Sequence, residues 1–258
     1  MKSQYDSVAQ EYDEVRPGYP NELIDKLISA SSVNIGSEIL EIGAGTGKAT
    51  MLLAEKGFKI HCIEREPKMA EILKRKCEGF SNISVTINDF ETWEATDDDK
   101  YDLVFSAQAF HWIDEEIKYK KCRRLLKDKG HLALFWYFSV VESEDTLDYL
   151  NSLFHKFSTG YACAGIDDFK RSFNDEKNKL RNSKCFGNIN GYIFEGAAAD
   201  QDAVLFTKRF NTTSAFALLD EQAKTMINKE LHEVINLNGG IVVSKLIYFL
   251  LTAEGDAE

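Results

Sequence analysis

The sequence predicts an α/β fold built on a mostly parallel β-sheet with helices on both faces. Short apolar runs recur along the first 140 residues, helical patterns separate several of them, and the first run leads into a glycine-rich turn. Nearly continuous apolar runs are typical of parallel strands that are covered by helices on both sides. These three observations together define the class.

The N-terminal segment predicts two helices before the sheet begins. Residues 5–15 carry an apolar stripe at helical spacing, and the segment RPGYP at 16–20 interrupts it with two prolines. A second helical pattern follows, with apolar positions Leu23, Ile24, Leu27 and Ile28.

Five short apolar runs are then expected to form strands. They are residues 37–45, 58–64, 83–89, 101–107 and 131–138. Helices are expected between several of these strands, over residues 48–56, 67–77 and 114–127. We expect the last of these helices to stop at Lys129-Gly130, because glycine favours the end of a helix.

The chain changes character after about residue 141. Residues 142–187 are mostly polar, with a helical piece near 143–157 and a charged stretch at 167–184, and predict an insertion over the sheet edge. Residues 188–198 and 241–251 predict the last strands. A long amphipathic helix is expected between these two strands, with Ala223, Met226, Ile227, Leu231 and Val234 facing inward.

Composition excludes several classes of protein. The formal net charge is -11, whereas binding to a phosphate backbone needs clustered Lys and Arg. The longest apolar stretch, Leu132 to Val141, is about half of the ~20 residues that a membrane-spanning helix needs. The five cysteines are widely spaced without a CxxC pair, so neither a disulfide framework nor a metal site is indicated. The expected setting is the cytoplasm.

The most informative motif is the run LEIGAGTG at residues 40–47. A strand leads into a G-x-G-x-G turn, where glycine lets the main chain turn tightly and approach a ligand. Lys48 occupies the third glycine position of the nicotinamide fingerprint, and Ile42 and Ala49 break the P-loop pattern. The loop therefore predicts a site for a nucleoside ligand without a phosphate at this turn.

Two further strand ends carry suitable side chains. Glu64 ends the second strand about 20 residues after the loop, where a carboxylate accepts hydrogen bonds from ribose hydroxyls. Asp89 and Phe90 follow the third strand, where an acid and an aromatic ring suit an adenine. Open α/β sheets bind ligands at the carboxyl ends of their strands, so these residues are expected to form one site.

At these residues the sequence resembles the class I S-adenosylmethionine-dependent methyltransferases. The resemblance rests on EIGAGTG at 41–47, Glu64, NDF at 88–90 and FSAQAFHWID at 105–114. The opening YDSVAQEYDEVRPGYP is similar to a small-molecule branch that includes trans-aconitate-type methyltransferases. The resemblance implies a Rossmann-like, seven-stranded sheet with an antiparallel last strand. It also implies a single domain with a lid at 1–34, a cofactor-binding core at 35–141, a substrate-side insertion at 142–187 and C-terminal elements at 188–258.

The resemblance also implies roles for individual residues. The loop residues would line the methionine part of the cofactor, Glu64 would bind the ribose, and Asp89 with Phe90 would bind the adenine. Arg65 would either stack beside the adenine or be a solvated arginine. The full expected cofactor-binding set is Tyr12, Arg16, Gly43, Ala44, Gly45, Glu64, Arg65, Met69, Asp89, Phe90, Ala107 and Gln108.

The aromatic residues after the fourth and fifth strands are candidates for the acceptor site. His111 is expected either to contact the substrate and act as a general base, or only to line the pocket with Trp112. Trp136 and Tyr137 are expected substrate contacts, although an aromatic strand end often belongs to the core.

The expected function is methyl transfer to a small-molecule acceptor, on oxygen or carbon, with a carboxylate or hydroxyl group as the expected acceptor and S-adenosylhomocysteine as the second product. The motifs of DNA methylases are missing, because Ser106 to Phe110 contain no proline and no Pro-Cys pair occurs. The expected protein is a monomer or weak homodimer that acts without nucleic acid or a membrane. Two alternatives stay open, a non-catalytic cofactor-binding module and, disfavoured by Lys48, a dinucleotide oxidoreductase.

Overall fold

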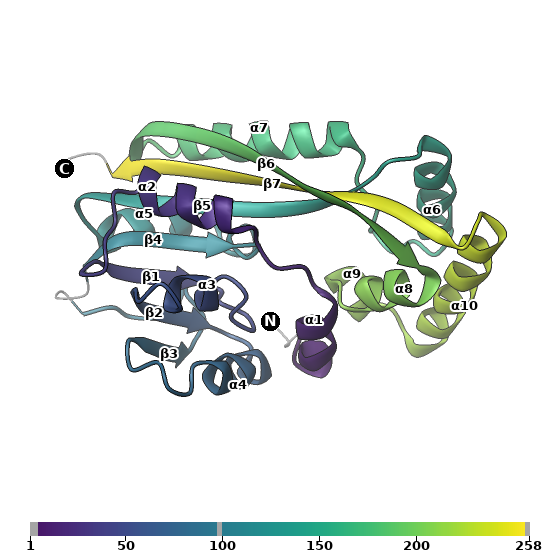
Figure 1. The fold of residues 1–258 in the computed structure, drawn as a ribbon, viewed down its shortest axis with the longest axis horizontal. Helices are drawn as coiled ribbons and strands as arrows, with labels where there is room; N and C mark the ends of the chain where they lie inside the picture. The colour runs from purple at the N-terminus through teal and green to yellow at the C-terminus, as the bar shows by residue number, and fades with distance from the viewer. Residues whose placement is uncertain (1–4, 97–99, 256–258) are drawn as a thin grey trace. The chain divides into compact units, whose positions relative to one another are not determined.

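The apolar runs of the first half fold as neighbouring parallel strands (Figure 1). The computed structural model describes residues 5–96 and 100–255, so the ends of the predicted domain lie outside the described residues. The strands of this half are β1 (Glu38–Ile42), β2 (Lys59–Glu64), β3 (Ile83–Ile87) and β4 (Tyr101–Ala107). The carboxyl ends of β1, β2 and β3 align, because Ile42 pairs with Ile63 and Glu64 pairs with Ile87.

Three longer strands complete the sheet. They are β5 (Leu126–Val141), β6 (Phe186–Asp202) and β7 (Ile241–Gly255). The strands of the described residues form one seven-stranded sheet in the order β3-β2-β1-β4-β5-β7-β6. β5 is parallel to β4, whereas β7 runs in the opposite direction (Figure 1). The Rossmann-like, mostly parallel sheet with an antiparallel last strand is therefore confirmed.

The chain divides into two compact units, and the boundary falls within the long strands. Unit 1 comprises Met1–Pro17, Tyr137–Ser172 and Glu195–Tyr248, and unit 2 comprises Gly18–Trp136, Phe173–Phe194 and Phe249–Glu258. β5, β6 and β7 have 16, 17 and 15 residues, against about 5–6 for an ordinary strand, so their halves pack in different units. The single-domain organisation expected from the sequence stays a prediction.

Helices surround the sheet at the places that the sequence pattern indicates. In unit 2 these are α2 (Asn21–Ala30), α3 (Thr50–Ala54), α4 (Pro67–Lys76), the 3₁₀ turn η2 (Phe110–Trp112) and α5 (Glu115–Leu125). Pro67 opens α4, where its missing N–H has no partner to lose. Asp114 caps α5 by accepting a hydrogen bond of 2.7 Å from the Glu116 amide.

The predicted end of the helix that became α5 was wrong. α5 ends at Leu125, and Lys129-Gly130 already belong to β5. Leu126 pairs with Tyr101 whereas His131 pairs with Leu103, so the extra residues of β5 form a bulge. Lys129 has a φ of 61° there, which is the left-handed geometry that a glycine-containing bulge uses.

The predicted insertion before the sixth strand folds as two helices, α6 (Glu144–Lys156) and α7 (Ile166–Asn182). The charged stretch at 167–184 is helical because Phe169 and Leu180 provide buried positions on an otherwise polar helix. The remaining helical elements are η1 (Asp6–Val8), α1 (Ala9–Val15), α8 (Ala203–Asn211), α9 (Ser214–Ala217) and α10 (Glu221–Leu237).

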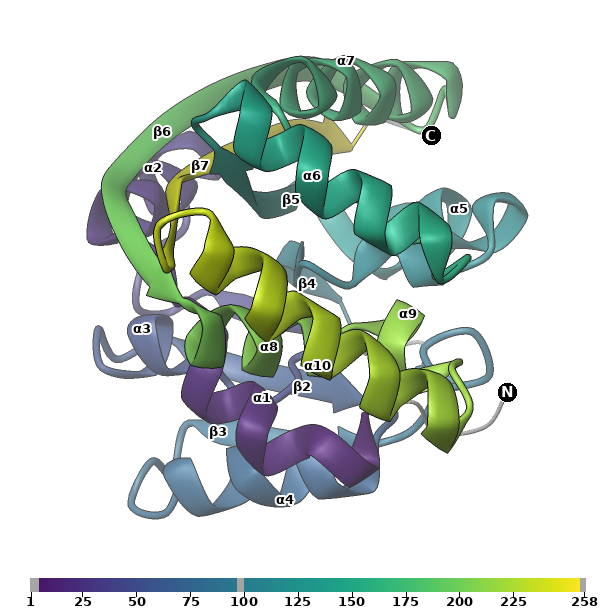
Figure 2. The same ribbon diagram turned by 90° about the vertical axis from the view of Figure 1, so that its right-hand side faces the viewer.

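Unit 1 has its own apolar core around α10. Figure 2 shows α10 beside α6, with α8 packed against α10. Ile227, Leu231 and Ile235 are fully buried at a spacing of four residues. Met226, which the sequence predicted to face inward, is instead 47% exposed. Met226 is exposed because the row of residues at i, i+4 and i+8 forms the packed face of α10, and Met226 lies about 100° around the helix axis from that row.

The core assignment predicts different costs for two substitutions on α10. Leu231→Ala is expected to lower the free energy of unfolding by about 2–5 kcal/mol, because it removes fully buried methyl groups. Met226→Ala is the matched control and should cost no more than about 0.5 kcal/mol. Urea unfolding of both variants measures the difference, and equal losses would contradict the packing of α10.

Candidate functional site

The glycine-rich loop between β1 and α3 adopts a conformation that requires glycine. Gly43 and Gly45 have φ values of 69° and 57°. The Gly43 amide donates to the Ile63 carbonyl at 2.8 Å, and a Cβ on Gly43 would lie 2.4 Å from the Cβ of Ala109. The nearest atom to a Cβ on Gly45 would be the sulfur of Met69 at 3.9 Å. The main chain at Gly45 is therefore open to a close ligand.

Glu64 at the end of β2 is fixed by two backbone amides. Its Oε2 accepts a hydrogen bond of 2.7 Å from Gly45, and its Oε1 accepts one of 2.8 Å from Glu66. Burial raises the pKa of this carboxyl group, and the hydrogen bonds from Glu66 and Gly45 oppose that rise. The Arg65 amide also stabilises the carboxylate, and a carboxylate offers about four acceptor positions, so capacity remains for a ligand hydroxyl.

Asp89 at the end of β3 lies next to Arg65. Asp89 Oδ1 accepts a hydrogen bond of 3.0 Å from the Glu91 amide, and Oδ2 lies 3.6 Å from Arg65 Nη1. Arg65 Nε also lies 3.4 Å from Glu66 Oε1, so this arginine is ion-paired and not simply solvated. The Phe90 ring is buried, with the Nζ of Lys121 4.9 Å from its centre.

The main chain just after β4 adopts a strained conformation. Gln108 has a φ of 60°, which is uncommon outside glycine, and its amide donates to the Phe135 carbonyl at 3.0 Å. Ser106 donates to the Ile42 carbonyl at 2.8 Å and so ties β4 to the start of the glycine loop. Residues held in such conformations often cluster at functional sites. Ala107, between these two residues, is half-buried.

The residues of unit 2 fit a nucleoside that carries hydroxyl and amino groups. The hydroxyl of Thr46, in the loop, is buried without a hydrogen-bond partner in the described part of the chain. Two carboxylates, on Glu64 and Asp89, stand at neighbouring strand ends and would repel a phosphate group. No cluster of three or more potential metal ligands occurs among residues 5–96 and 100–255.

One buried acid, Glu41, was missed by the sequence analysis. It lies in β1 beneath the loop, 1% exposed, and its Oε2 accepts a hydrogen bond of 2.5 Å from Thr50. Burial raises the pKa of Glu41 to about 8, so it keeps its proton near neutral pH and links β1 to α3. The signal for it was the single charged residue inside the apolar run of residues 39–42.

His111 is held as a neutral imidazole. Trp136 Nε1 donates to His111 Nδ1 at 3.3 Å, which leaves the proton on Nε2. Desolvation of the ring lowers the pKa of His111 to about 4, and the charges of Lys118 and Lys179 contribute, although the residue as a whole is exposed. The ring of Trp112, itself 38% exposed, lies 4.9 Å from that of His111. His111 therefore presents a hydrogen-bond donor, not a base.

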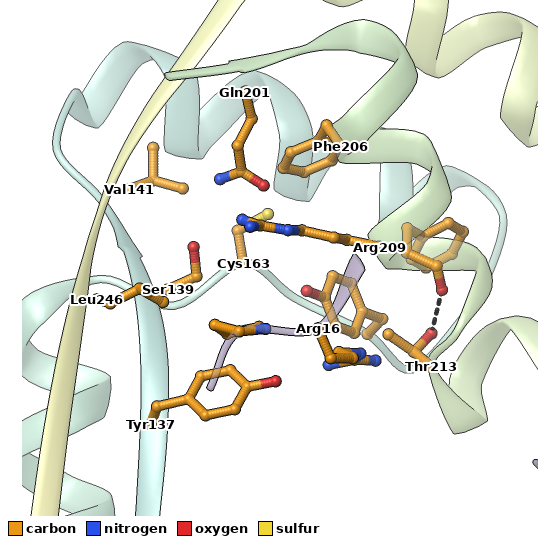
Figure 3. Close-up of a pocket in the computed structure, with 13 residues that line it drawn as sticks. Arg16, Tyr137, Ser139, Val141, Cys163, Gln201, Phe206, Arg209, Thr213 and Leu246 are labelled. Atoms are coloured by element: carbon orange, nitrogen blue, oxygen red, sulfur yellow. Dashed lines mark hydrogen bonds between the residues drawn. The ribbon is translucent and has the colours of Figure 1, made fainter. Parts of the chain in front are cut away.

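Three of the predicted site residues lie in unit 1, namely Tyr12, Arg16 and Tyr137. Arg16 donates to Thr212 through Nε (2.8 Å, to Oγ1) and Nη2 (2.9 Å, to the carbonyl oxygen), and its guanidinium lies 5.2 Å from the centre of the Tyr12 ring. Arg16 and Tyr137 line one cavity of this unit (Figure 3). The ligand roles of all the predicted site residues stay predictions.

The chain was compared with known proteins. Residues 39–130 match the family model described as a methyltransferase domain. This match supports a methyltransferase domain of class I in this part of the chain. The match spans this domain from β1 to the bulge in β5, including the loop, Glu64 and Asp89.

Two of the curated relatives are named as methyltransferases. An uncharacterized methyltransferase from Mycobacterium tuberculosis is 32% identical over 136 residues, which are 53% of each chain. A malonyl-[acyl-carrier protein] O-methyltransferase from Ilyobacter polytropus is 32% identical over 118 residues, which are 43% of each chain. The chain spans about half the length of the curated relatives it matches.

Two solved structures share the fold over nearly the whole chain. A phosphoethanolamine N-methyltransferase from Haemonchus contortus, in complex with S-adenosylhomocysteine, matches with a TM-score of 0.55 at 14% identity, over 98% of this chain and 58% of that one. The [4+2]-cyclase SpnF matches with a TM-score of 0.57 at 14% identity, over 100% of this chain and 97% of that one. At this identity the likeness shows the fold alone.

Described residues contain no helix with the length and apolar character needed to cross a membrane. The five cysteines are all unpaired thiols.

The close contact at Gly43 predicts a strong effect of one methyl group. Gly79 also has a positive φ, of 96°, but a Cβ there would meet nothing within 4 Å. Gly79→Ala should therefore cost about 1–2 kcal/mol of stability, the strain of the left-handed backbone alone. Gly43→Ala should cost roughly 1–3 kcal/mol more, because the methyl group overlaps Ala109. Urea unfolding measures both, and similar losses would show that the loop relaxes freely.

The hydrogen bond from Trp136 predicts the titration of His111. Nitrogen-15 NMR of labelled histidines should find the Nε2–H tautomer and a pKa near 4. Trp136→Phe removes the donor that favours the neutral ring and should raise the pKa of His111 by roughly one unit. Trp112→Phe keeps the donor and serves as the control. Protonation of His111 at its ordinary pKa in the unaltered protein would exclude this arrangement.

Proposed function

We propose that the protein transfers a methyl group from S-adenosylmethionine to a small-molecule acceptor. The observation that carries the proposal is the buried Glu64 carboxylate, held by the Gly45 and Glu66 amides beside a loop that only glycine can form. The methyltransferase relatives and the fold shared with a structure bound to S-adenosylhomocysteine support the choice of cofactor.

The chain's own residues would hold the cofactor in the following way. Glu64 would accept hydrogen bonds from the ribose hydroxyls with its remaining acceptor capacity. The open main chain at Gly45 would allow close approach, and Asp89 would accept from the adenine amino group. When bound, the cofactor supplies a methyl group that its sulfonium already activates. The protein's task is then to position the acceptor, which is worth on the order of 7–11 kcal/mol.

The state of His111 favours one class of acceptor. A hydroxyl or carbon acid must lose a proton before it attacks, but His111 Nδ1 already accepts from Trp136 and Nε2 carries a proton. A carboxylate is already ionised at neutral pH and needs no base. The Nε2–H of His111 would donate a hydrogen bond to such an acceptor and help to orient it. We therefore propose O-methylation of a carboxylate in preference to C-methylation.

Calorimetry with S-adenosylhomocysteine tests the cofactor assignment. The unaltered protein is expected to bind it with a micromolar Kd, and Glu64→Gln should weaken binding at least tenfold, because one acceptor of the ribose hydroxyls is replaced by an amide donor. Glu71→Gln makes the same chemical change at an exposed position of α4 and should leave the Kd within threefold.

Three results would oppose the proposal. Binding of NADH in place of S-adenosylhomocysteine would favour a dinucleotide oxidoreductase. Equal loss in Glu64→Gln and Glu71→Gln would show that Glu64 has no part in the site. No binding to folded protein would exclude the cofactor.

A further inference from the structure

Unit 1 encloses a cavity of about 60 Å³ that the sequence analysis did not foresee. Its polar lining includes Arg16, Tyr137, Tyr161, Gln201 and Arg209. Figure 3 shows Arg209 reaching across the cavity from α8, with Arg16 and Tyr137 on one side and Gln201 on the other. A volume of about 10–15 Å³ per water position leaves room for roughly four waters, or for one acid group with an adjoining carbon.

The cavity carries two positive charges and no negative one. Neither Arg16 nor Arg209 forms an ion pair with an acid anywhere in the described part of the chain, and no Asp or Glu lines the cavity. The hydrogen bonds of Arg16 go to the hydroxyl and carbonyl of Thr212, and Arg209 Nε donates to the Val15 carbonyl at 3.0 Å. Arg16 also shares a hydrogen bond with the Tyr137 side chain, and no carboxylate of the cavity lining balances the two charges.

Burial and neighbouring groups shift the pKa of both guanidinium groups. Burial lowers the pKa of Arg209, Tyr137 opposes that change, and the charge of Arg16 adds to it. Burial also opposes the charge on Arg16, but the phenol oxygens of Tyr137 and Tyr12 outweigh it and raise its pKa. Both groups stay charged at neutral pH. Two like charges brought together in a partly buried cavity are unfavourable unless an anion joins them.

A purely structural role explains only part of this arrangement. The bonds from Arg16 to Thr212 and from Arg209 to Val15 connect the N-terminal segment to α8. The bond to Val15 uses only Nε of Arg209, so both Nη groups of Arg209 remain available. The N–H bonds of these two groups suit a planar carboxylate. A lysine or a glutamine could have made the single bond to Val15 without adding a second guanidinium to the cavity.

The other polar groups of the cavity complete an acceptor-binding environment. Gln201 Nε2 donates to Ser244 Oγ at 2.6 Å, and Ser139 Oγ donates to the same oxygen at 2.8 Å, so the amide of Gln201 is fixed in place. Tyr161 also lines the cavity and carries a hydroxyl group. It can donate to a carboxylate oxygen.

We propose that this cavity binds a carboxylate group of a small organic acid, through Arg209 and Arg16, with Tyr161 as a further donor. That this acid is the methyl acceptor rests on the proposed function. The small volume and the pair of arginines together select a compact acid group over a neutral or bulky one.

Calorimetry without any cofactor tests the cavity directly. The probes are succinate and tricarballylate, with succinamide as the uncharged control and inorganic phosphate as the competing oxyanion. The unaltered protein is expected to bind at least one carboxylate probe and not succinamide. Arg209→Met should weaken that binding at least tenfold. Lys208→Met removes the same charge from an exposed position of the same helix and should change binding less than twofold.

A second variant and a second ligand keep the outcomes distinct. Arg209→Lys keeps the charge but loses the planar pair of donors, so intermediate binding is expected if the protein stays folded, as circular dichroism checks. S-adenosylhomocysteine should bind Arg209→Met as well as it binds the unaltered protein.

Each contrary result overturns a defined part of the proposal. No carboxylate binding, or equal losses in Arg209→Met and Lys208→Met, would reject the site. Binding of phosphate without carboxylates would reject the ligand class. Loss of S-adenosylhomocysteine binding in Arg209→Met would assign the arginines to the cofactor's own carboxylate. Carboxylate binding in a protein that fails to bind S-adenosylhomocysteine would keep the site but end its link to methyl transfer.

Discussion

The carboxylate of Glu64 joins two turns of the main chain that would otherwise be independent. One oxygen accepts the amide of Gly45, in the loop after β1, and the other accepts the amide of Glu66, in the turn before α4. Because the acid is buried, each of these bonds also offsets the cost of keeping a charge away from water. The shape of the glycine loop, the start of α4 and the ribose-binding capacity that we propose all depend on this one side chain.

The two units have opposite electrostatic character at their candidate sites. In unit 2 the strand ends present Glu64 and Asp89, with Glu41 buried below. In unit 1 the cavity presents two arginines and no acid, in a chain whose net charge is -11. A neutral nucleoside with hydroxyl and amino groups suits the first environment, and a carboxylate suits the second. In the proposed reaction this contrast would disfavour each ligand at the other's site.

The fold by itself does not decide the reaction. Structures with similar TM-scores to this chain include an N-methyltransferase and a [4+2]-cyclase. The loop and the strand-end acids therefore support the proposed methyl transfer, and His111 and the two arginines support the proposed carboxylate acceptor. His111 is instructive here, because its residue type suggested a base, whereas the bond from Trp136 makes it a donor.

The sequence by itself determined the parallel sheet, the glycine loop and the acids that follow β2 and β3. These features depend on local rules, namely the spacing of apolar residues, the backbone freedom of glycine and the position of a side chain at a strand end. The sequence could not show that α10 buries Ile227, Leu231 and Ile235 but not Met226, because several helical faces are equally apolar until a partner covers one. Nor could it show the cavity, whose Arg16 bonds to Thr212 across 196 residues of chain. Such groupings, like the tautomer of His111, are decided by tertiary packing, because only packing brings distant polar groups within hydrogen-bond distance.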